Sequence, residues 1–171
     1  MRHRVAITIP CALVLVVAGC ASPALHFYTL SAATAPTAAS SDLSVVVGPV
    51  SVPAAIDRPQ IVVTTGPNQI WLDEFNRWAS PLQSNIASAV VENLIALLGT
   101  PRVSLYSQTV SVDADYRAAI EVQRFESALG AAATLDAVWT VRRAKDGKSQ
   151  TGRTTVREPA LSGPSIGPRN S

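Results

Sequence analysis

The clearest periodic pattern in the chain lies between residues 80 and 99. Large apolar residues recur there at spacings of three and four, which places them along one stripe of a helix. The stripe consists of Leu82, Ile86, Val90, Leu94, Leu97 and Leu98. Ser80 is a suitable N-cap, Pro81 suits the first helical position, and Gly99 is a suitable C-terminal stop. The pattern therefore predicts one amphipathic helix whose apolar face must pack on another element.

Short segments rich in valine, threonine and aromatic residues surround this helix and predict eight β-strands. Their expected ranges are 26–30, 43–52, 60–65, 69–73, 102–107, 115–125, 131–143 and 149–156. Turn signals such as Gly66-Pro67-Asn68 and Asp146-Gly147 separate neighbouring segments and favour antiparallel hairpins. The Gly48-Pro49 pair inside the second segment indicates a bulge or an edge position. We expect an α+β fold, a mostly antiparallel sheet with one main amphipathic helix packed on one face.

The first twenty residues follow a different pattern. Arg2, His3 and Arg4 precede an apolar run over residues 5–17, which is too short to span a membrane stably, and small residues then lead to Cys20. These features are typical of a secretory signal peptide. The sequence Val17-Ala18-Gly19-Cys20 also resembles a bacterial lipobox, in which the signal is cleaved before a cysteine that becomes acylated. The alternative is an ordinary secreted protein with a coincidental cysteine.

These patterns divide the chain into four segments. Residues 1–19 are the expected signal peptide, residues 20–24 the acylated Cys20 with its tether, and residues 25–157 the folded domain. Residues 158–171 are rich in proline, glycine and serine and are predicted to be a disordered tail. Ala21 follows the cysteine, which resembles the default sorting to the outer membrane. We therefore expect a lipoprotein on the periplasmic face of the outer membrane, anchored by covalent lipid on Cys20.

Charge argues against a nucleic-acid partner. The whole chain has 14 Lys and Arg residues against 12 Asp and Glu, with a pI near 8.8. Removal of the signal takes away Arg2 and Arg4 and no acidic residue, which leaves 12 basic residues against 12 acidic ones. A chain without an excess of basic residues lacks the surface that phosphate binding requires.

The same processing leaves little for catalysis or metal binding. Cys11 would leave with the signal and Cys20 would be acylated, so no thiol would remain for a disulfide, zinc or a nucleophile. His26 would be the one remaining histidine, which cannot seed a metal site. Acidic pairs occur at Asp73-Glu74 and in the segment 113–115, where turn or surface roles are the simpler interpretation. We expect a non-enzymatic protein without a cofactor other than its lipid.

Six side chains are candidates for binding a partner. They are Asp57, Arg58, Trp71, Phe75, Arg77 and Trp78. The last four bring three aromatic rings and an arginine close together before the helix, which is a composition typical of interfaces. Asp57 and Arg58 lie in a turn between two prolines. The alternatives are that the tryptophans cap the core, and that Asp57 and Arg58 form a local ion pair.

Several segments together resemble the PqiC (YmbA) family, also described as ABC-type transport auxiliary lipoprotein components. The resemblance covers about residues 20 to 157 and depends on the order and spacing of short motifs. The motifs are Phe27-Tyr28-Thr29-Leu30, Val47-Gly48-Pro49-Val50-Ser51-Val52-Pro53, Ile56-Asp57-Arg58-Pro59-Gln60-Ile61-Val62, Arg77-Trp78-Ala79-Ser80-Pro81-Leu82, Glu92-Asn93-Leu94, Val122-Gln123-Arg124-Phe125 and Leu135-Asp136-Ala137-Val138-Trp139.

The resemblance implies an outer-membrane lipoprotein that works with a membrane-bound MCE-domain protein in lipid transport between two membranes. It implies no catalytic residues. Such domains usually continue into a second amphipathic helix, whereas this chain passes from Arg157 into the proline- and glycine-rich tail. If that helix normally covers part of the sheet, apolar surface would be exposed here, which is a liability or a reason to oligomerise. A homo-oligomeric ring is a further hypothesis, because a lipid conduit would need a ring. The alternatives are a chaperone-like assembly lipoprotein and, last, a hydrolase.

Overall fold

The computed structural model of the protein describes residues 23–33, 35, 40–107, 113–128 and 130–159. The predicted signal peptide and Cys20 lie outside the described residues, as does the predicted tail beyond residue 159. The elements in chain order are β1 (His26–Tyr28), β2 (Val45–Ser51), β3 (Gln60–Gly66), β4 (Gln69–Trp78), α1 (Leu82–Leu98), β5 (Val103–Leu105), β6 (Tyr116–Ala128), β7 (Ala132–Arg143) and β8 (Ser149–Pro159). In the described part of the chain, no helix combines the length and apolar character needed to cross a membrane.

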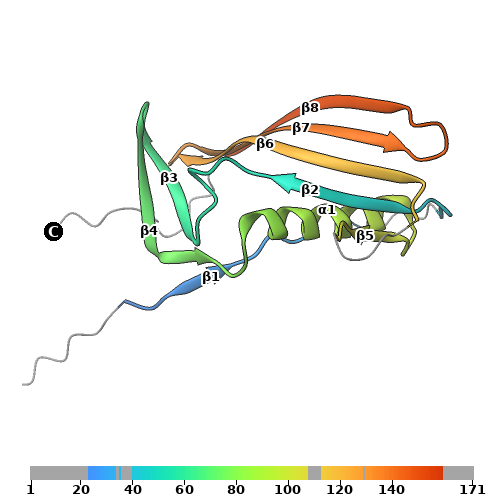
Figure 1. Ribbon diagram of the computed structural model, residues 1–171. Helices are drawn as coiled ribbons and strands as arrows, with labels where there is room; N and C mark the ends of the chain where they lie inside the picture. The colour runs from blue at the N-terminus through green and yellow to red at the C-terminus, as the bar shows by residue number, and fades with distance from the viewer. Residues whose placement is uncertain (1–22, 34, 36–39, 108–112, 129, 160–171) are drawn as a thin grey trace, which may run out of the picture.

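The sheet divides into two branches at β6. One edge of β6 pairs in parallel with β2 near its start and with β3 near its end. The sheet continues from β2 to β5, and from β3 through β4 to β1. The other edge of β6 pairs with β7, which in turn pairs with β8. Figure 1 shows the result, in which the β3–β4 hairpin stands apart from the long layer of β2, β6, β7 and β8.

The α+β fold is confirmed, but the sheet is antiparallel only in part. The pairs β3–β4, β6–β7 and β7–β8 are antiparallel, as the turn signals between them predict. The pairs β1–β4, β2–β5, β2–β6 and β3–β6 are parallel. Turn signals report only on strands that are neighbours in sequence, whereas parallel strands are joined by longer connections and are brought together by burial.

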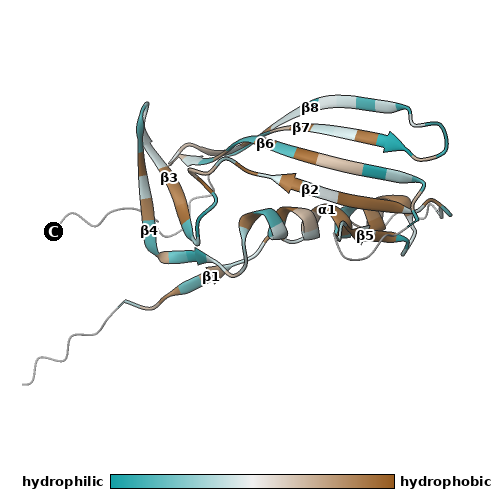
Figure 2. Cartoon of the chain, in the orientation of Figure 1, coloured by the Kyte–Doolittle hydropathy of each residue, from teal (hydrophilic) through white to brown (hydrophobic). Residues whose placement is uncertain are grey.

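The predicted helix lies on one face of the sheet and closes two apolar clusters. Leu82 and Ile86 pack with Ile56 and Val122 at one end. Val90, Val91, Leu94 and Leu98 pack against the second cluster, formed by Val45, Val47 and Val103 of β2 and β5. Figure 2 shows that β2 is hydrophobic along most of its length. The apolar face of α1 packs on this strand because both surfaces are thereby removed from water. Leu97 is a correction to the predicted stripe, since its side chain lies beside the contact with the sheet and is 47% exposed.

The ends of α1 agree with the prediction at one terminus and not at the other. Gly99 adopts the left-handed conformation with φ of 61°, and its N–H donates to Ile95 O at 3.0 Å, as expected for a C-terminal stop. The predicted N-cap Ser80 is wrong, because the cap residue is Pro81. Pro81 is extended with ψ of 136°, and its carbonyl accepts the N–H of Asn85 at 3.0 Å. The helix therefore begins one residue later than predicted.

All eight predicted strands are present, and their limits carry further corrections. β4 continues to Trp78 beyond the predicted end at residue 73, and β6 continues to Ala128. β8 extends to Pro159, so the predicted disordered tail cannot begin at residue 158. Gly48 and Pro49 lie at a register shift between Val47 and Val50, which confirms the bulge. β2 lies between β5 and β6, so the alternative of an edge strand is wrong.

Candidate functional site

A bulge in β4 presents Phe75 to solvent. β3 pairs Gln60 with Arg77 and then Ile61 with Asp73, so residues 74–76 have no partner on β3. The buried Asp73 carboxylate holds this bulge, because Oδ1 accepts the N–H groups of Phe75 and Asn76 at 3.0 Å each. Its Oδ2 accepts Nδ2 of Asn76 at 2.7 Å. The N–H groups of Phe75 and Asn76 therefore have an acceptor within the bulge, and Phe75 is 43% exposed.

β1 adds further aromatic side chains beside this bulge. It pairs in parallel with the end of β4, with His26 opposite Asn76 and Tyr28 opposite Trp78. The Tyr28 hydroxyl donates to Asn76 Oδ1 at 2.9 Å. Four exposed side chains lie on β1, just before it, or at the neighbouring bulge in β4, and we call them the β1–β4 corner. They are Leu25, Phe27, Tyr28 and Phe75.

Leu25 and Phe27 are not among the six residues predicted from the sequence to bind a partner. Leu25 is 50% exposed and Phe27 62% exposed, whereas large apolar residues in a strand normally face a core. The available signal was the aromatic-rich segment His26-Phe27-Tyr28, which follows the predicted lipobox within six residues. That segment predicted a strand, but only the structure shows that one of its sides is left uncovered.

The candidates on β4 have different surroundings. Trp78 packs on Phe125, with ring centroids 6.0 Å apart and planes at 53°, beside the first apolar cluster. This placement agrees with the alternative that Trp78 caps the core. Trp71 lies opposite Val63 in the β3–β4 hairpin and is half-buried. Arg77 pairs with Glu74 across the bulge, with 3.2 Å between Nη2 and Oε2.

Asp57 and Arg58 lie close to the β1–β4 corner. The loop that carries them precedes Pro59, whose carbonyl accepts the N–H of Trp78 at 2.7 Å. Asp57 Oδ2 accepts Nε2 of Gln83 at 3.3 Å, and Arg58 Nε donates to the carbonyl of Ala55 at 3.1 Å. The ion pairs among the described residues do not join Asp57 to Arg58, so the local ion pair is wrong. All six candidates therefore gather in the half of the molecule that contains β1, the β3–β4 hairpin and the start of α1.

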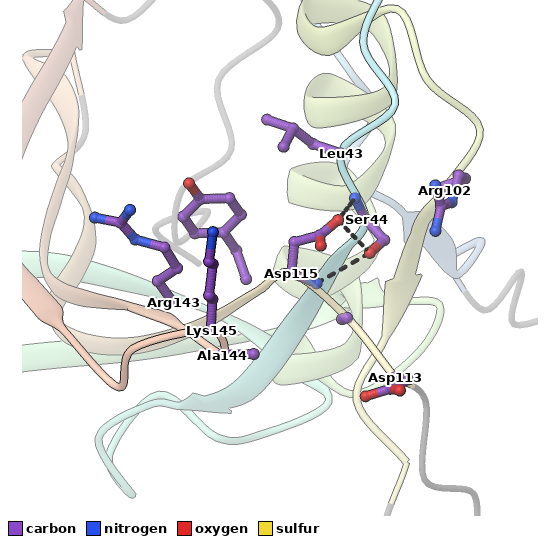
Figure 3. A pocket seen from close by; sticks show the side chains of 10 residues that line it. Leu43, Ser44, Arg102, Asp113, Asp115, Arg143, Ala144 and Lys145 are labelled. Atoms are coloured by element: carbon purple, nitrogen blue, oxygen red, sulfur yellow. Dashed lines mark hydrogen bonds between the residues drawn. The ribbon is translucent and has the colours of Figure 1, made fainter.

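A pocket of about 510 Å³ lies at the opposite end of the long layer, where β2 and β6 begin and β7 ends. Figure 3 shows its polar lining, with Arg143 and Lys145 on one side and Arg102 on the other. Between them, Asp115 Oδ2 accepts the Ser44 hydroxyl at 2.7 Å and the Ser44 N–H at 2.8 Å. Sequence reasoning considered Asp115 only as part of an acidic pair and missed this pocket.

The hydrogen bonds at Ser44 determine the state of the Asp115 carboxylate. The Ser44 hydroxyl first, and its backbone N–H second, hold the pKa of Asp115 below its ordinary value, and the charge of Arg102 adds to this effect. Asp113 points away from Asp115 in Figure 3, so the two carboxylates do not face each other across the pocket. Asp115 is therefore an ionised acceptor that joins the start of β2 to the start of β6.

Metal ligation has no support in the described part of the chain. Among residues 23–33, 35, 40–107, 113–128 and 130–159, no three His, Cys, Asp or Glu side chains group as metal ligands would. His26 lies on the short edge strand β1, opposite Asn76.

The chain folds as a small α+β domain, and known proteins share this fold. Protein XCC0632 from Xanthomonas campestris, of the DUF330 family, superimposes with a TM-score of 0.68 at 23% identity, over 81% of this chain and 80% of that one. A second crystal structure, of an uncharacterized protein, gives a TM-score of 0.64 at 20% identity, over 80% and 81% of the two chains. No curated protein sequence matches this chain.

The family follows from the sequence itself. The family model described as "ABC-type transport auxiliary lipoprotein component" matches residues 28–165. This chain therefore belongs to that family, as the motifs from Phe27 to Trp139 indicated. It is an auxiliary lipoprotein component of a transport system, and such a component works in the cell envelope with other proteins.

Proposed function

We propose that this protein is the outer-membrane-anchored, periplasmic subunit of an MCE-type intermembrane lipid transport system and that it is not an enzyme. The observation that carries the proposal is the family match over residues 28–165, which begins eight residues after Cys20. An auxiliary component needs a partner, and the resemblance to PqiC proteins implies a membrane-bound MCE-domain protein. Acyl chains on Cys20 would hold the subunit at the membrane.

The direction of the fold supports an anchored docking subunit. The predicted anchor lies five residues before Leu25, so the end with β1 and the start of α1 is the end near the membrane. β6 has 13 residues and extends away from that end for roughly 40 Å. The pocket with Arg102, Arg143 and Lys145 lies at the far end, where a partner arriving through the periplasm would meet it. We also propose that copies of the subunit form a ring around a lipid conduit.

One observation favours a second function, which is assembly of another envelope protein. β8 is an edge strand of 11 residues that pairs only with β7 among the described strands. Its open edge could accept a strand from an unfolded client by β-augmentation. Arg153, Arg157 and Pro159 lie along this strand, and charged residues and proline are common protection against such pairing. Transport is therefore the better supported of the two functions.

Photo-crosslinking in native envelopes tests the partner. A photo-reactive amino acid replaces Arg58 near the anchor, Lys145 at the pocket, or Arg157 on β8, each in a separate strain with the full-length chain. We expect one MCE-domain protein in the crosslinked products from Lys145, at the end of the domain far from the anchor. A product from Arg157 alone that contains an outer-membrane protein under assembly would support the second function. Absence of any MCE-domain protein from all three strains would contradict the transport proposal.

A companion experiment tests the anchor and the ring. Cys20→Ser should move the protein from the membrane to the soluble periplasmic fraction and should remove the acyl mass from the mature N-terminal peptide. The lipidated protein in detergent should give the mass of several copies by light scattering. A monomer at high protein concentration would contradict the ring and leave the transport subunit intact.

A further inference from the structure

The β1–β4 corner is an exposed apolar surface made by two strands and a bulge. Leu25 and Phe27 are two residues apart, so they point to the same side of the extended chain. Phe27 is in register with Arg77, and Phe75 lies two residues before Arg77. With Phe27 at 62% exposure, it is the most exposed large apolar residue of the described chain. Exposed apolar side chains on neighbouring strands at one end of a sheet mark contact surfaces.

Hydrogen bonds fix the backbone and side chains that carry this exposed surface. The Asp73 carboxylate fixes the bulge through the N–H groups of Phe75 and Asn76, and Asn76 Oδ1 then accepts the Tyr28 hydroxyl. One chain of hydrogen bonds therefore connects a buried carboxylate to the aromatic ring of β1. Tyr28 presents an apolar ring while its hydroxyl stays satisfied, an arrangement suited to the boundary between water and lipid.

The sequence determines how far this surface can lie from a membrane. Cys20 and Leu25 are five residues apart, and a fully extended chain spans at most about 3.6 Å per residue. The tether therefore reaches at most roughly 18 Å, which is less than half the length of the 13-residue strand β6. A domain on so short a tether keeps its first strand within roughly 18 Å of the anchored residue.

We infer that the β1–β4 corner rests in the interfacial layer of the bilayer and thereby sets the orientation of the domain on the membrane. This inference depends on the lipid anchor of the proposed function. Leu25, Phe27 and Phe75 enter the boundary between headgroups and acyl chains, while Tyr28 stays at headgroup level. Arg58 lies in the neighbouring loop, where its Nε donates to the carbonyl of Ala55, and its charge suits anionic headgroups.

A lipid surface explains the position of these residues better than a protein partner does. A partner arriving from the periplasm would approach the end of the domain that the tether leaves free, whereas the corner lies at the tethered end. With the β1–β4 corner in the membrane, the start of β6 and the pocket beside it point away from the membrane. The pocket is then accessible to a partner in the periplasm.

The test uses the full-length lipidated protein in vesicles of phosphatidylethanolamine and phosphatidylglycerol. A photo-reactive amino acid replaces Phe75, and in a matched control it replaces Lys148, which is highly exposed in the β7–β8 turn. Lipid adducts are counted by mass spectrometry after irradiation. We expect at least about tenfold more lipid adducts at position 75 than at position 148, since burial of a large apolar side chain favours lipid by that factor or more.

A second variant separates contact from tethering. Phe27→Ser combined with Phe75→Ser leaves the anchor and the fold intact, because both side chains are exposed. With a photo-reactive residue in place of Leu25, the number of lipid adducts at position 25 should then fall roughly tenfold. The urea midpoint of unfolding should stay that of the parent chain. The acyl mass on the Cys20 peptide is measured in every sample.

The outcomes distinguish this inference from the proposed function. Equal adduct counts at positions 75 and 148 on an acylated chain would overturn the membrane contact and leave the anchored subunit standing. A protein adduct at position 75 would make the corner a partner interface and overturn the inference as well. A Cys20 peptide without acyl mass would remove the anchor, and the proposed localisation would fail together with the membrane contact.

Discussion

The indole ring of Trp139 covers the backbone of Gly152 across the β7–β8 pair. The two residues are directly opposite each other, and the indole N–H donates to the Thr154 hydroxyl at 3.1 Å. A Cβ atom on residue 152 would lie 2.2 Å from Cζ2 of the ring. The ring therefore occupies the space that any other residue at position 152 would need, on the same side of the sheet as α1.

Gly152→Ala should destabilise the protein through this contact. The ring must leave its place over β8 and lose its hydrogen bond, which we expect to cost about 1–3 kcal/mol in the free energy of unfolding. Urea denaturation of the lipidated protein in detergent measures the loss. In a background of Trp139→Ala, the same substitution at residue 152 should cost much less, because the opposing ring is gone.

Gly66→Ala is the matched control for that experiment. A Cβ atom on residue 66 would lie 3.8 Å from Cβ of Gln69, an ordinary van der Waals distance. The free energy of unfolding should stay within about 0.5 kcal/mol of the parent value. A loss at Gly66 as large as that at Gly152 would contradict the steric explanation.

Arg153 should stabilise the protein only while Asp136 is ionised. Arg153 donates from Nε at 2.8 Å and from Nη2 to the Asp136 carboxylate, and it is the main cause that lowers the pKa of this group below 3.8. The unfolded chain then binds the proton more tightly, so stability rises with pH across this range. Arg153→Met should lower the urea midpoint at pH 7, and the difference should shrink as the pH falls below about 3.8.

Arg157→Met is the control for this pH dependence. Arg157 lies four residues along the same strand, on the same side as Arg153, and it forms no ion pair among the described residues. Its substitution should leave the urea midpoint and its pH profile close to those of the parent. An equal effect of both arginines would indicate net charge rather than the contact with Asp136.

Asp73 should be the most sensitive polar residue of the bulge in β4. Asp73→Ala leaves the N–H groups of Phe75 and Asn76 without their acceptor, and we expect a loss of about 1–3 kcal/mol in unfolding free energy. Asp73→Asn keeps one acceptor oxygen for these groups and should cost less. Thermal unfolding by circular dichroism compares the two. An alanine variant as stable as the parent would show that the bulge forms without the carboxylate.

Two leucines of α1 should differ strongly although both belong to the predicted stripe. Leu82 is 1% exposed, and Leu82→Ala should cost about 2–5 kcal/mol. Leu97 is 47% exposed, and Leu97→Ala should cost less than about 1 kcal/mol. Chemical denaturation of both variants measures the two losses in the free energy of unfolding. Equal losses would mean that Leu97 is covered in the assembled protein, as it would be by another copy or a partner.

Much of the local structure could be predicted because local rules determine it. The spacing of apolar residues predicts α1, and Gly99 ends the helix through a backbone conformation that other residues adopt with difficulty. The Asp146-Gly147 turn predicts the β7–β8 hairpin for the same reason, with φ of 70° at Gly147. The start of α1 could not be placed as well, since Ser80 and Pro81 both fit the rules for helix termini.

The sequence predicted the six candidate residues but not the different surroundings that the fold gives them. The six candidates lie around one end of the fold, yet Trp78 faces the core while Phe75 faces solvent. The difference arises from the β4 bulge, which depends on a long-range mismatch with β3 and on the buried carboxylate of Asp73. The pattern of apolar and polar residues in β4 does not predict this mismatch. A bulge is defined by the register with the partner strand, and that register is not visible in the sequence of one strand.

The sequence by itself determined the α+β class, the family, the main helix and the antiparallel hairpins, since periodicity, turn residues and motif order are properties of neighbouring positions. Only the tertiary structure decided the parallel pairs of β2 with β5 and β6, the division of the sheet at β6, and the exposure of Leu25, Phe27 and Phe75. These features depend on which distant segments bury one another. That choice is made by packing of the whole chain, because the free energy of burial does not depend on separation along the sequence.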